Sequence, residues 1–126
     1  MTTHNNQNLY TVQAGEDLSS QAARFKVITL AGTLFSGTGT GRAAGVNITS
    51  ARSGEQASYV MNGITKVVAG GAVNTLGFPV AAASGGFMVA ASSGGVAFGR
   101  ALETCASGDL VQVMCDFRIP GFWSGT

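Results

Sequence analysis

The sequence predicts an all-β domain, built as a small antiparallel sandwich or barrel of short strands. Short runs of β-branched and aromatic residues recur along the chain, and Gly-Gly pairs separate several of them. One segment alone has a helical pattern. Several short strands with glycine turns are typical of both architectures, and periodicity does not choose between them.

The composition indicates a single domain with a weak core. The chain has 126 residues, which is one domain by size, and 19 of them are glycine. Small side chains bury little apolar area. Because burial stabilises by about 25 cal/mol per Å² of apolar surface, the isolated monomer is expected to be marginally stable. Association with copies of itself or with a larger surface would add stability that the core lacks.

We expect three parts along the chain. Residues 1–8, with the sequence M-T-T-H-N-N-Q-N, have no apolar anchor and are expected to form a flexible arm. Residues 9–119 form the β domain. Residues 120–126 form a tail, because Pro120 stops the last strand.

The first half of the domain is expected to begin with a strand at Leu9–Ala14. Asp17–Phe25 is ambiguous, since Asp17 could cap a helical turn. Phe25–Ala31 and Ala43–Thr49 are rich in β-forming residues and predict strands on either side of the loop Ser36–Gly41.

The central apolar runs Gln56–Met61 and Ile64–Ala69 are joined by Asn62-Gly63. Asn-Gly between two such runs is the strongest short signal for a β-hairpin. A glycine bulge inside one longer strand is the alternative. The sequence leaves both open.

Glycine pairs then divide the chain into further short strands. Gly70-Gly71, Gly85-Gly86 and Gly94-Gly95 are expected to be turns between neighbours. The strands predicted around them are Ala72–Leu76, Phe78–Ala82, Phe87–Ala91 and Val96–Phe98.

The last predicted hairpin pairs Arg100–Cys105 with Leu110–Phe117 through the turn Ala106–Asp109. In the second strand Val111, Val113, Cys115 and Phe117 face one way, and the outward set that alternates with them includes Met114. This alternation is typical of a half-buried antiparallel strand. If Cys105 lies opposite Leu110, Cys115 is roughly 17 Å further along, too far for a disulfide. Both thiols are expected to be free.

The sequence offers no constellation for catalysis, metal or cofactors. The single histidine, His4, lies in the predicted arm, where nothing holds it beside a nucleophile. Two cysteines are too few for a thiolate zinc site. Glu16-Asp17 is expected to be a turn or cap, and Gly37–Gly41 lacks the spacing and the helix of a phosphate loop. We therefore expect no enzyme, no cofactor and no small-molecule substrate.

Charge and hydropathy exclude other classes of partner. Net charge is +1 and the seven basic residues are scattered singly, which argues against nucleic acid. No apolar run approaches the length of a membrane span and no secretory signal is present, so we expect no membrane partner and assembly in a cytoplasm. The predicted C-terminal tail carries two adjacent aromatic residues, Phe122 and Trp123. Such aromatic anchors often fill a pocket on a neighbouring subunit, and packing on their own domain is the alternative.

Several pieces in order resemble phage capsid decoration, or cement, proteins. They are Glu16–Ser19, Phe25–Val27, Ala44–Val46, Gly54-Glu55, Gly63–Gly71, Phe98–Glu103, Ser107–Asp109 and Val111–Val113. The resemblance covers roughly residues 15–113. The long loop Thr33–Arg42 and the aromatic tail depart from the family pattern.

The resemblance implies a noncatalytic β-rich virion protein that stabilises a phage head. It implies binding to the outer capsid surface, bridging of major capsid protein subunits, and clustering as a homotrimer. Candidate subunit or capsid contacts are His4 and Asn5 of the arm, Tyr10 of the first strand, and Phe122 and Trp123 of the tail. A phage surface or tail-associated protein that binds host glycans is the alternative; it requires a cluster of exposed aromatic rings.

Overall fold

The computed structural model describes residues 8–19, 23–36, 43–91, 96–117 and 121–122. These residues form strands and loops, and no α-helix occurs among them. The strands are β1 (Asn8–Gln13), β2 (Val27–Thr29), β3 (Ala43–Asn47), β4 (Gln56–Val68), β5 (Pro79–Ala83), β6 (Phe87–Ala90), β7 (Val96–Ala97), β8 (Gly99–Ala101), β9 (Leu110–Asp116) and β10 (Gly121–Phe122). The all-β prediction is confirmed.

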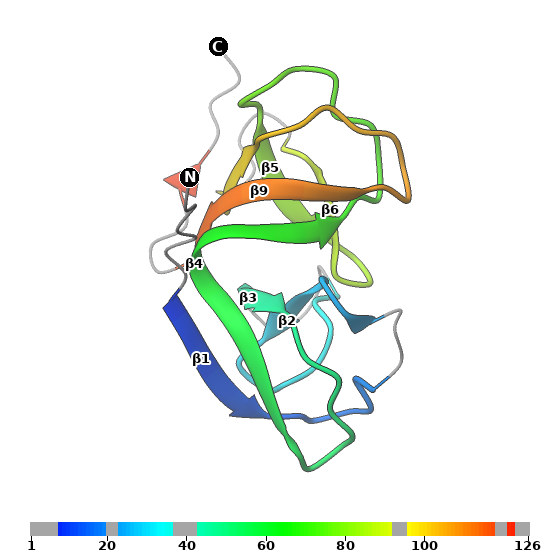
Figure 1. Cartoon of the computed structure of the whole chain (residues 1–126), viewed down its shortest axis with the longest axis vertical. Coiled ribbons are helices and arrows are strands. Elements are labelled where there is room, and N and C mark those ends of the chain that lie inside the picture. Colours follow the sequence, from blue (N-terminus) through cyan, green and yellow to red (C-terminus); the bar gives the residue numbers. More distant parts are fainter. Residues whose placement is uncertain (1–7, 20–22, 37–42, 92–95, 118–120, 123–126) are drawn as a thin grey trace, which may run out of the picture.

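Eight strands join one antiparallel sheet that curls almost into a barrel (Figure 1). Its order is β2-β3-β4-β9-β8-β5-β6, with β1 paired to β4 off this path, and β7 and β10 form a separate pair. The ring closes where Ala69, just after β4, bridges Met88 of β6, and the Gly70 amide donates to the Met88 carbonyl at 2.7 Å. A barrel-like closure removes two sheet edges that would otherwise expose unpaired backbone groups.

The prediction of a hairpin at Asn62-Gly63 is wrong, and the alternative, one longer strand with a bulge, is correct. β4 runs without interruption through this dipeptide. Asn8 pairs with Asn62 and Leu9 with Val60, so Met61 is an extra residue on β4, which is a β-bulge. Asn-Gly therefore follows a bulge here instead of closing a turn, with Gly63 at φ 120°.

The bulge lets one strand serve two halves of the molecule. The first half of β4 pairs with β1 and β3, and the second half pairs with β9 from Asn62 to Val68 (Figure 1). An inserted residue also exchanges the two faces of a strand. The molecule has two apolar clusters, described below, and β4 contributes to both. Before the bulge, the even-numbered Val60 packs in the barrel cluster and the odd-numbered Tyr59 in the β1-side cluster. After the bulge, the odd-numbered Val67 packs in the barrel cluster.

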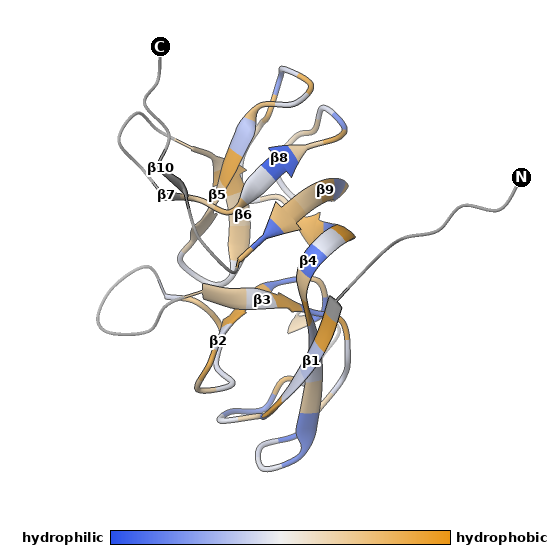
Figure 2. Cartoon of the chain, turned by 90° about the vertical axis from the view of Figure 1, so that its left-hand side faces the viewer, coloured by the Kyte–Doolittle hydropathy of each residue, from blue (hydrophilic) through white to orange (hydrophobic). Residues whose placement is uncertain are grey.

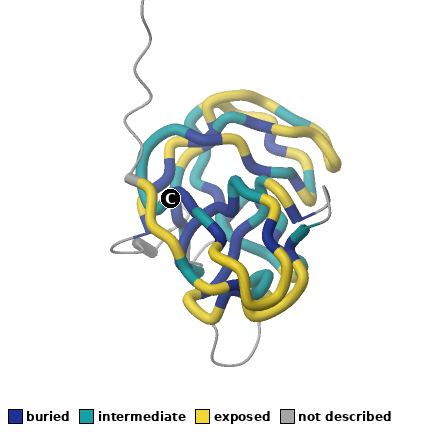
Figure 3. The backbone as a smooth tube through the Cα atoms, turned by 60° about the horizontal axis from the view of Figure 1, so that its bottom comes forward, coloured by how far each residue is buried: buried dark blue, intermediate teal, exposed yellow. Residues whose placement is uncertain are grey.

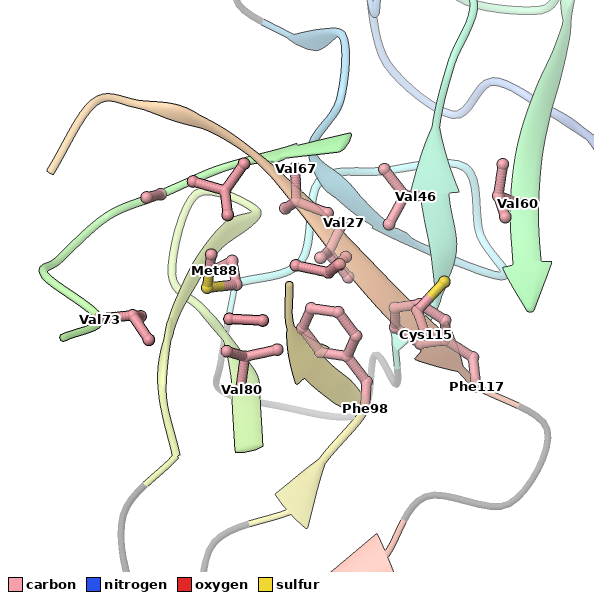
Figure 4. Packing of buried hydrophobic residues seen from close by; sticks show 14 residues of the cluster. Val27, Val46, Val60, Val67, Val73, Val80, Met88, Phe98, Cys115 and Phe117 are labelled. Carbon is pink, nitrogen blue, oxygen red and sulfur yellow. The ribbon is translucent and has the colours of Figure 1, made fainter. Parts of the chain in front are cut away.

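Two apolar clusters result. The barrel cluster lies mainly among β4, β9, β8, β5 and β6, and eight of its fourteen buried residues are valine (Figure 4). These residues are Val27, Val46, Val60, Val67, Ala69, Val73, Val80, Met88, Phe98, Ala101, Val111, Val113, Cys115 and Phe117. Phe98 stacks on Phe117 with 4.6 Å between the ring centroids. The β1-side cluster lies under β1, β3 and the first half of β4; its buried residues are Ala14, Leu18, Ala23, Ile28, Ala44, Ala51, Ala57 and Tyr59. Five of those eight residues are alanine, so this half buries little apolar area, as the composition predicts.

Local geometry corrects one prediction near the start of the domain. Phe25 has φ 61°, in the left-handed region, so the strand expected at Phe25–Ala31 begins only at Val27. Asp17 Oδ1 accepts the Ser19 amide at 2.9 Å, which is an Asx-type turn, and Leu18 forms a β-bridge with Ala51. Residues 20–22 of the ambiguous segment Asp17–Phe25 lie outside the described residues.

The strand expected at Ala72–Leu76 is wrong. Only Val73 makes a β-bridge there, and its partner is Cys105. The final hairpin is confirmed, but its register differs by one residue because Ala101 pairs with Val113. The chain leaves the ladder after Leu102, so Cys105 lies opposite Val73 and not opposite Leu110.

Gly85-Gly86 forms the predicted turn between β5 and β6. Both residues have positive φ, at 85° and 81°, which suits glycine. A Cβ on Gly86 would lie 2.8 Å from the Val27 carbonyl oxygen, because the Gly86 carbonyl accepts the Val27 amide. Gly94-Gly95 lies outside the described residues.

Much of the exposed chain lies in loops and turns (Figure 3). Among the strands, β9 alternates between buried and outward positions, whereas β2 is buried throughout. In the part of the chain that the structure describes, no helix has the length and apolarity to span a bilayer.

Candidate functional site

The structure describes part of the predicted contact set. Tyr10 lies on β1, and the backbone of Phe122 lies in β10. His4, Asn5 and Trp123 lie outside the described residues. Phe122 pairs through its backbone with Val96 of β7, so part of the predicted tail forms a short strand with its own chain.

Tyr10 is the one aromatic residue of the described ranges whose side chain is classed as exposed. Its ring stacks on Tyr59 across the β1–β4 ladder, with centroids 6.2 Å apart, and 46% of the residue remains accessible. Burial, with a smaller contribution from Tyr10, raises the pKa of Tyr59. The glycan-binding alternative requires a cluster of exposed aromatic rings. Within the described ranges the structure shows one such ring, that of Tyr10.

The acidic side chains serve the loops. Five of them accept backbone N–H groups: Glu16 from Leu34, Asp17 from Ser19, Glu55 from Arg52, Glu103 from Gln112 and Asp109 from Ala106. The hydrogen bonds to Ser19 lower the pKa of the Asp17 carboxyl group. The turn predicted at Glu16-Asp17 is confirmed.

Both thiols are free, as predicted. Cys115 is buried in the barrel cluster, and burial, with the nearby Asp116 charge, raises its pKa to about 12. A buried thiol of this kind is inert, since the thiolate is the reactive form. Over the ranges described, no group of three or more His, Cys, Asp or Glu residues is placed to hold a metal ion.

A surface of mixed apolar and polar side chains lies on the outer side of the sheet formed by β4, β9 and β8. We call it the outer sheet face; it consists of Ile64, Lys66, Val68, Arg100, Leu102, Leu110, Gln112, Met114 and Asp116. Ladder pairs place Met114 between Ile64 and Arg100, and place Leu110 beside Val68. Met114 is 52% exposed and Leu110 45% exposed. Figure 2 shows β9 coloured mainly as hydrophobic, with hydrophilic positions among them.

This face shares part of the composition of protein interfaces. Methionine and arginine, present here as Met114 and Arg100, are enriched in such interfaces, whereas lysine and aspartate, present here as Lys66 and Asp116, are depleted. The alternation of β9 predicted that Met114 faces outward, but no sequence feature marked it as a contact residue. The available signal was its apolar character at a position where Gln112 and Asp116 alternate with buried residues.

Comparison with known proteins identifies the fold. No family model matches the sequence, and no curated protein matches it. Among solved structures, the chain is similar to the head fiber gp8.5 N base of bacteriophage phi29. The TM-score is 0.59 with 16% sequence identity, and the match covers 88% of this chain and 95% of that one. The two chains share a fold over nearly their whole lengths.

Proposed function

We propose that this chain is a noncatalytic structural protein of a phage head. It binds the outer surface of the head and stabilises the shell by bridging major capsid protein subunits. The observation that carries the proposal is the shared fold with a phage head fibre base, which spans almost all of both chains. The resemblance of residues 15–113 to capsid decoration proteins supports the same role independently.

The stabilising mechanism is a matter of linkage. A protein that binds the assembled shell and not its free subunits adds its binding free energy to the stability of the shell. A shell presents many equivalent sites, so even a modest interface at each site contributes. We place the contact on the outer sheet face, because Met114 and Leu110 leave apolar area in water there.

Met114→Glu is expected to abolish co-sedimentation with mature heads of the phage, because it introduces a charge at the centre of the outer sheet face. The native chain is expected to co-sediment with heads and not with free major capsid protein. Leu30→Glu is the matched control, since Leu30 is 68% exposed in a turn away from this face, and it should bind like the native chain. Equal binding of native chain to heads and to free subunits would refute the cementing mechanism.

The N-terminal arm is a second proposed contact. Removing residues 1–7, which include His4 and Asn5, leaves β1 whole because the strand begins at Asn8. In the same sedimentation assay this shortened chain is expected to bind heads more weakly while keeping the native urea midpoint. Unchanged affinity would exclude the arm.

The purified chain is expected to be a trimer, which is the state that the family resemblance implies. A closed ring of three would bury apolar area that this small core leaves exposed. Static light scattering across a range of concentrations measures the mass directly. A monomer at the highest concentration would refute the expectation.

A further inference from the structure

Among the residues that the structure describes, no strand pairs with one edge of β1. β1 pairs with β4 alone, while the first half of β4 carries β3 on its other side. The Ala14 amide donates to the Glu55 carbonyl, at 2.8 Å. Because such bonds alternate along an antiparallel strand, Val12 and Tyr10 also direct their backbone groups toward β4. The backbone N–H and C=O groups of Leu9 and Thr11 therefore point away from it.

This edge is open only over its first part. Gly32 lies against the end of β1, where a Cβ on it would come 2.2 Å from the Gln13 carbonyl oxygen, and the Gly15 amide donates to the Gly32 carbonyl. The neighbouring turn thus closes the edge at Gln13. We call the backbone groups of Leu9 and Thr11 the open edge. In Figure 1, β1 forms the margin of its half of the molecule, with β4 on its inner side.

The open edge lacks common protective features. Natural edge strands are usually guarded by charged residues, proline or a covering segment. The sequence of β1, N-L-Y-T-V-Q, contains no charge and no proline, and Leu9 and Tyr10 are both about half exposed, at 51% and 46%. An uncharged, apolar, accessible edge is a template for pairing with another strand.

The side chains near the open edge identify what would fit. Tyr10 pairs with Tyr59 on the ladder and stacks on it, so both rings lie on the face of the sheet that covers the β1-side cluster. Val12 packs against the same cluster. A strand added at the open edge with an apolar residue opposite Tyr10 would continue this small core.

We propose that the occupant is β1 of a second copy of this chain, paired antiparallel about a two-fold axis at Tyr10. Opposed residues of an antiparallel pair lie on the same face of the sheet. A two-fold axis between two copies of one strand must therefore pass between a residue and its own copy. With the axis at Tyr10, Leu9 of each copy lies opposite Thr11 of the other. All the open-edge groups are then paired. An axis at Thr11 would set Leu9 opposite Gln13, where Gly32 closes the edge.

The pairing places the two Tyr10 rings together at the axis, each backed by its own Tyr59. Cross-strand aromatic pairs contribute roughly 0.2–1 kcal/mol each, so the contact is weak in isolation and gains from repetition on a shell. It goes beyond the proposed function: the pairing itself does not require that function, whereas its repetition on a shell rests on it. A three-fold ring cannot use the contact, because a ring joins different patches. The β1 pair would instead join neighbouring trimers.

Disulfide trapping tests the register. In the proposed pair the two Tyr10 Cα atoms form a non-hydrogen-bonded pair about 4.5 Å apart, within disulfide range. Purified Tyr10→Cys protein, mildly oxidised, is expected to run mainly as a covalent dimer on a non-reducing denaturing gel. Gln13→Cys is the matched control; its Cα atoms would be roughly 20 Å apart, so it should stay monomeric. The native chain controls for Cys105 and Cys115.

Charge repulsion gives a second test that retains the ring. Thr11→Lys places two lysines beside the axis and is expected to weaken self-association at least about tenfold in sedimentation velocity. Thr11→Val should associate like the native chain. Native-like urea midpoints for both variants would show that the fold is kept, since Thr11 is exposed.

Several outcomes overturn the inference. A monomeric Tyr10→Cys protein would do so, as would equal cross-linking of Gln13→Cys, or native association by Thr11→Lys. Loss of head binding by Thr11→Lys without any Tyr10→Cys dimer would show that the head supplies the strand. Trapped dimers together with no head binding by the native chain would support the β1 pair and refute the proposed function alone.

Discussion

Replacing Gly99 by alanine is expected to lower the free energy of unfolding by about 3 kcal/mol or more. A Cβ on Gly99 would lie 2.1 Å from the Met114 carbonyl oxygen and 2.9 Å from the Cys115 Cα atom. Both obstacles are backbone atoms of β9, so no side chain can turn aside. The β8–β9 ladder must separate, and it lies in the middle of the barrel. Urea denaturation followed by circular dichroism measures the loss.

Gly71→Ala is the matched control for this substitution. Its nearest neighbour would be the Val89 Cγ1 atom at 3.9 Å, an ordinary contact, so its stability should stay within about 0.5 kcal/mol of the native chain. If Gly99→Ala proved as stable as Gly71→Ala, the close approach of β8 and β9 would be refuted.

Alkaline pH is expected to destabilise the fold through Cys115. Burial raises its pKa to about 12 from an ordinary value of 9.0, so the folded state holds this proton more tightly than the unfolded chain does. The stabilisation is complete below about pH 9 and is lost progressively as pH rises toward 12. The slope approaches about 1.4 kcal/mol per pH unit, for a total of roughly 4 kcal/mol.

The measurement is urea unfolding at half-unit steps from pH 7 to pH 11, with a reducing agent present. Cys115→Ala is expected to flatten the decline between pH 9 and pH 10, below the range where Tyr59, whose pKa is also raised, contributes. Cys105→Ala leaves the buried thiol in place and should keep the native slope. A native slope in Cys115→Ala would assign the alkaline loss to another group.

Local sequence predicted the strands most reliably where alternation was long and the turn residues were specific. β9 follows the predicted pattern, with Val111, Val113, Cys115 and Phe117 all buried. The turn at Gly85-Gly86 is also correct, because two adjacent residues with positive φ favour glycine. These features depend on neighbours in the chain, which the sequence displays.

Predictions were wrong where a distant segment decides the local conformation. Asn62-Gly63 continues a strand because β1 and β9, far apart in sequence, pair with its two sides. Val73 forms a bridge because Cys105 meets it, and the rest of Ala72–Leu76 has no ladder to join. No local pattern contains that information.

The candidate site divides in the same way. The sequence selected Tyr10, whose ring is accessible, but its stacking on Tyr59 and the closure of the β1 edge by Gly32 follow from the fold. Met114 was expected to face outward, yet its place beside Ile64 and Arg100 depends on the registers of three strands. Surfaces built from several strands exist only after those strands pair.

The amino-acid sequence alone determined that this protein is all-β, with glycine turns and few charged residues, because composition and alternation are properties of single segments. The tertiary structure alone decided that β4 spans two halves, that the sheet closes at Ala69 and Met88, and that β1 keeps an open edge. The physical reason is that hydrogen bonds between strands, and the apolar area that they bury together, join residues whose separation along the chain carries no local signal.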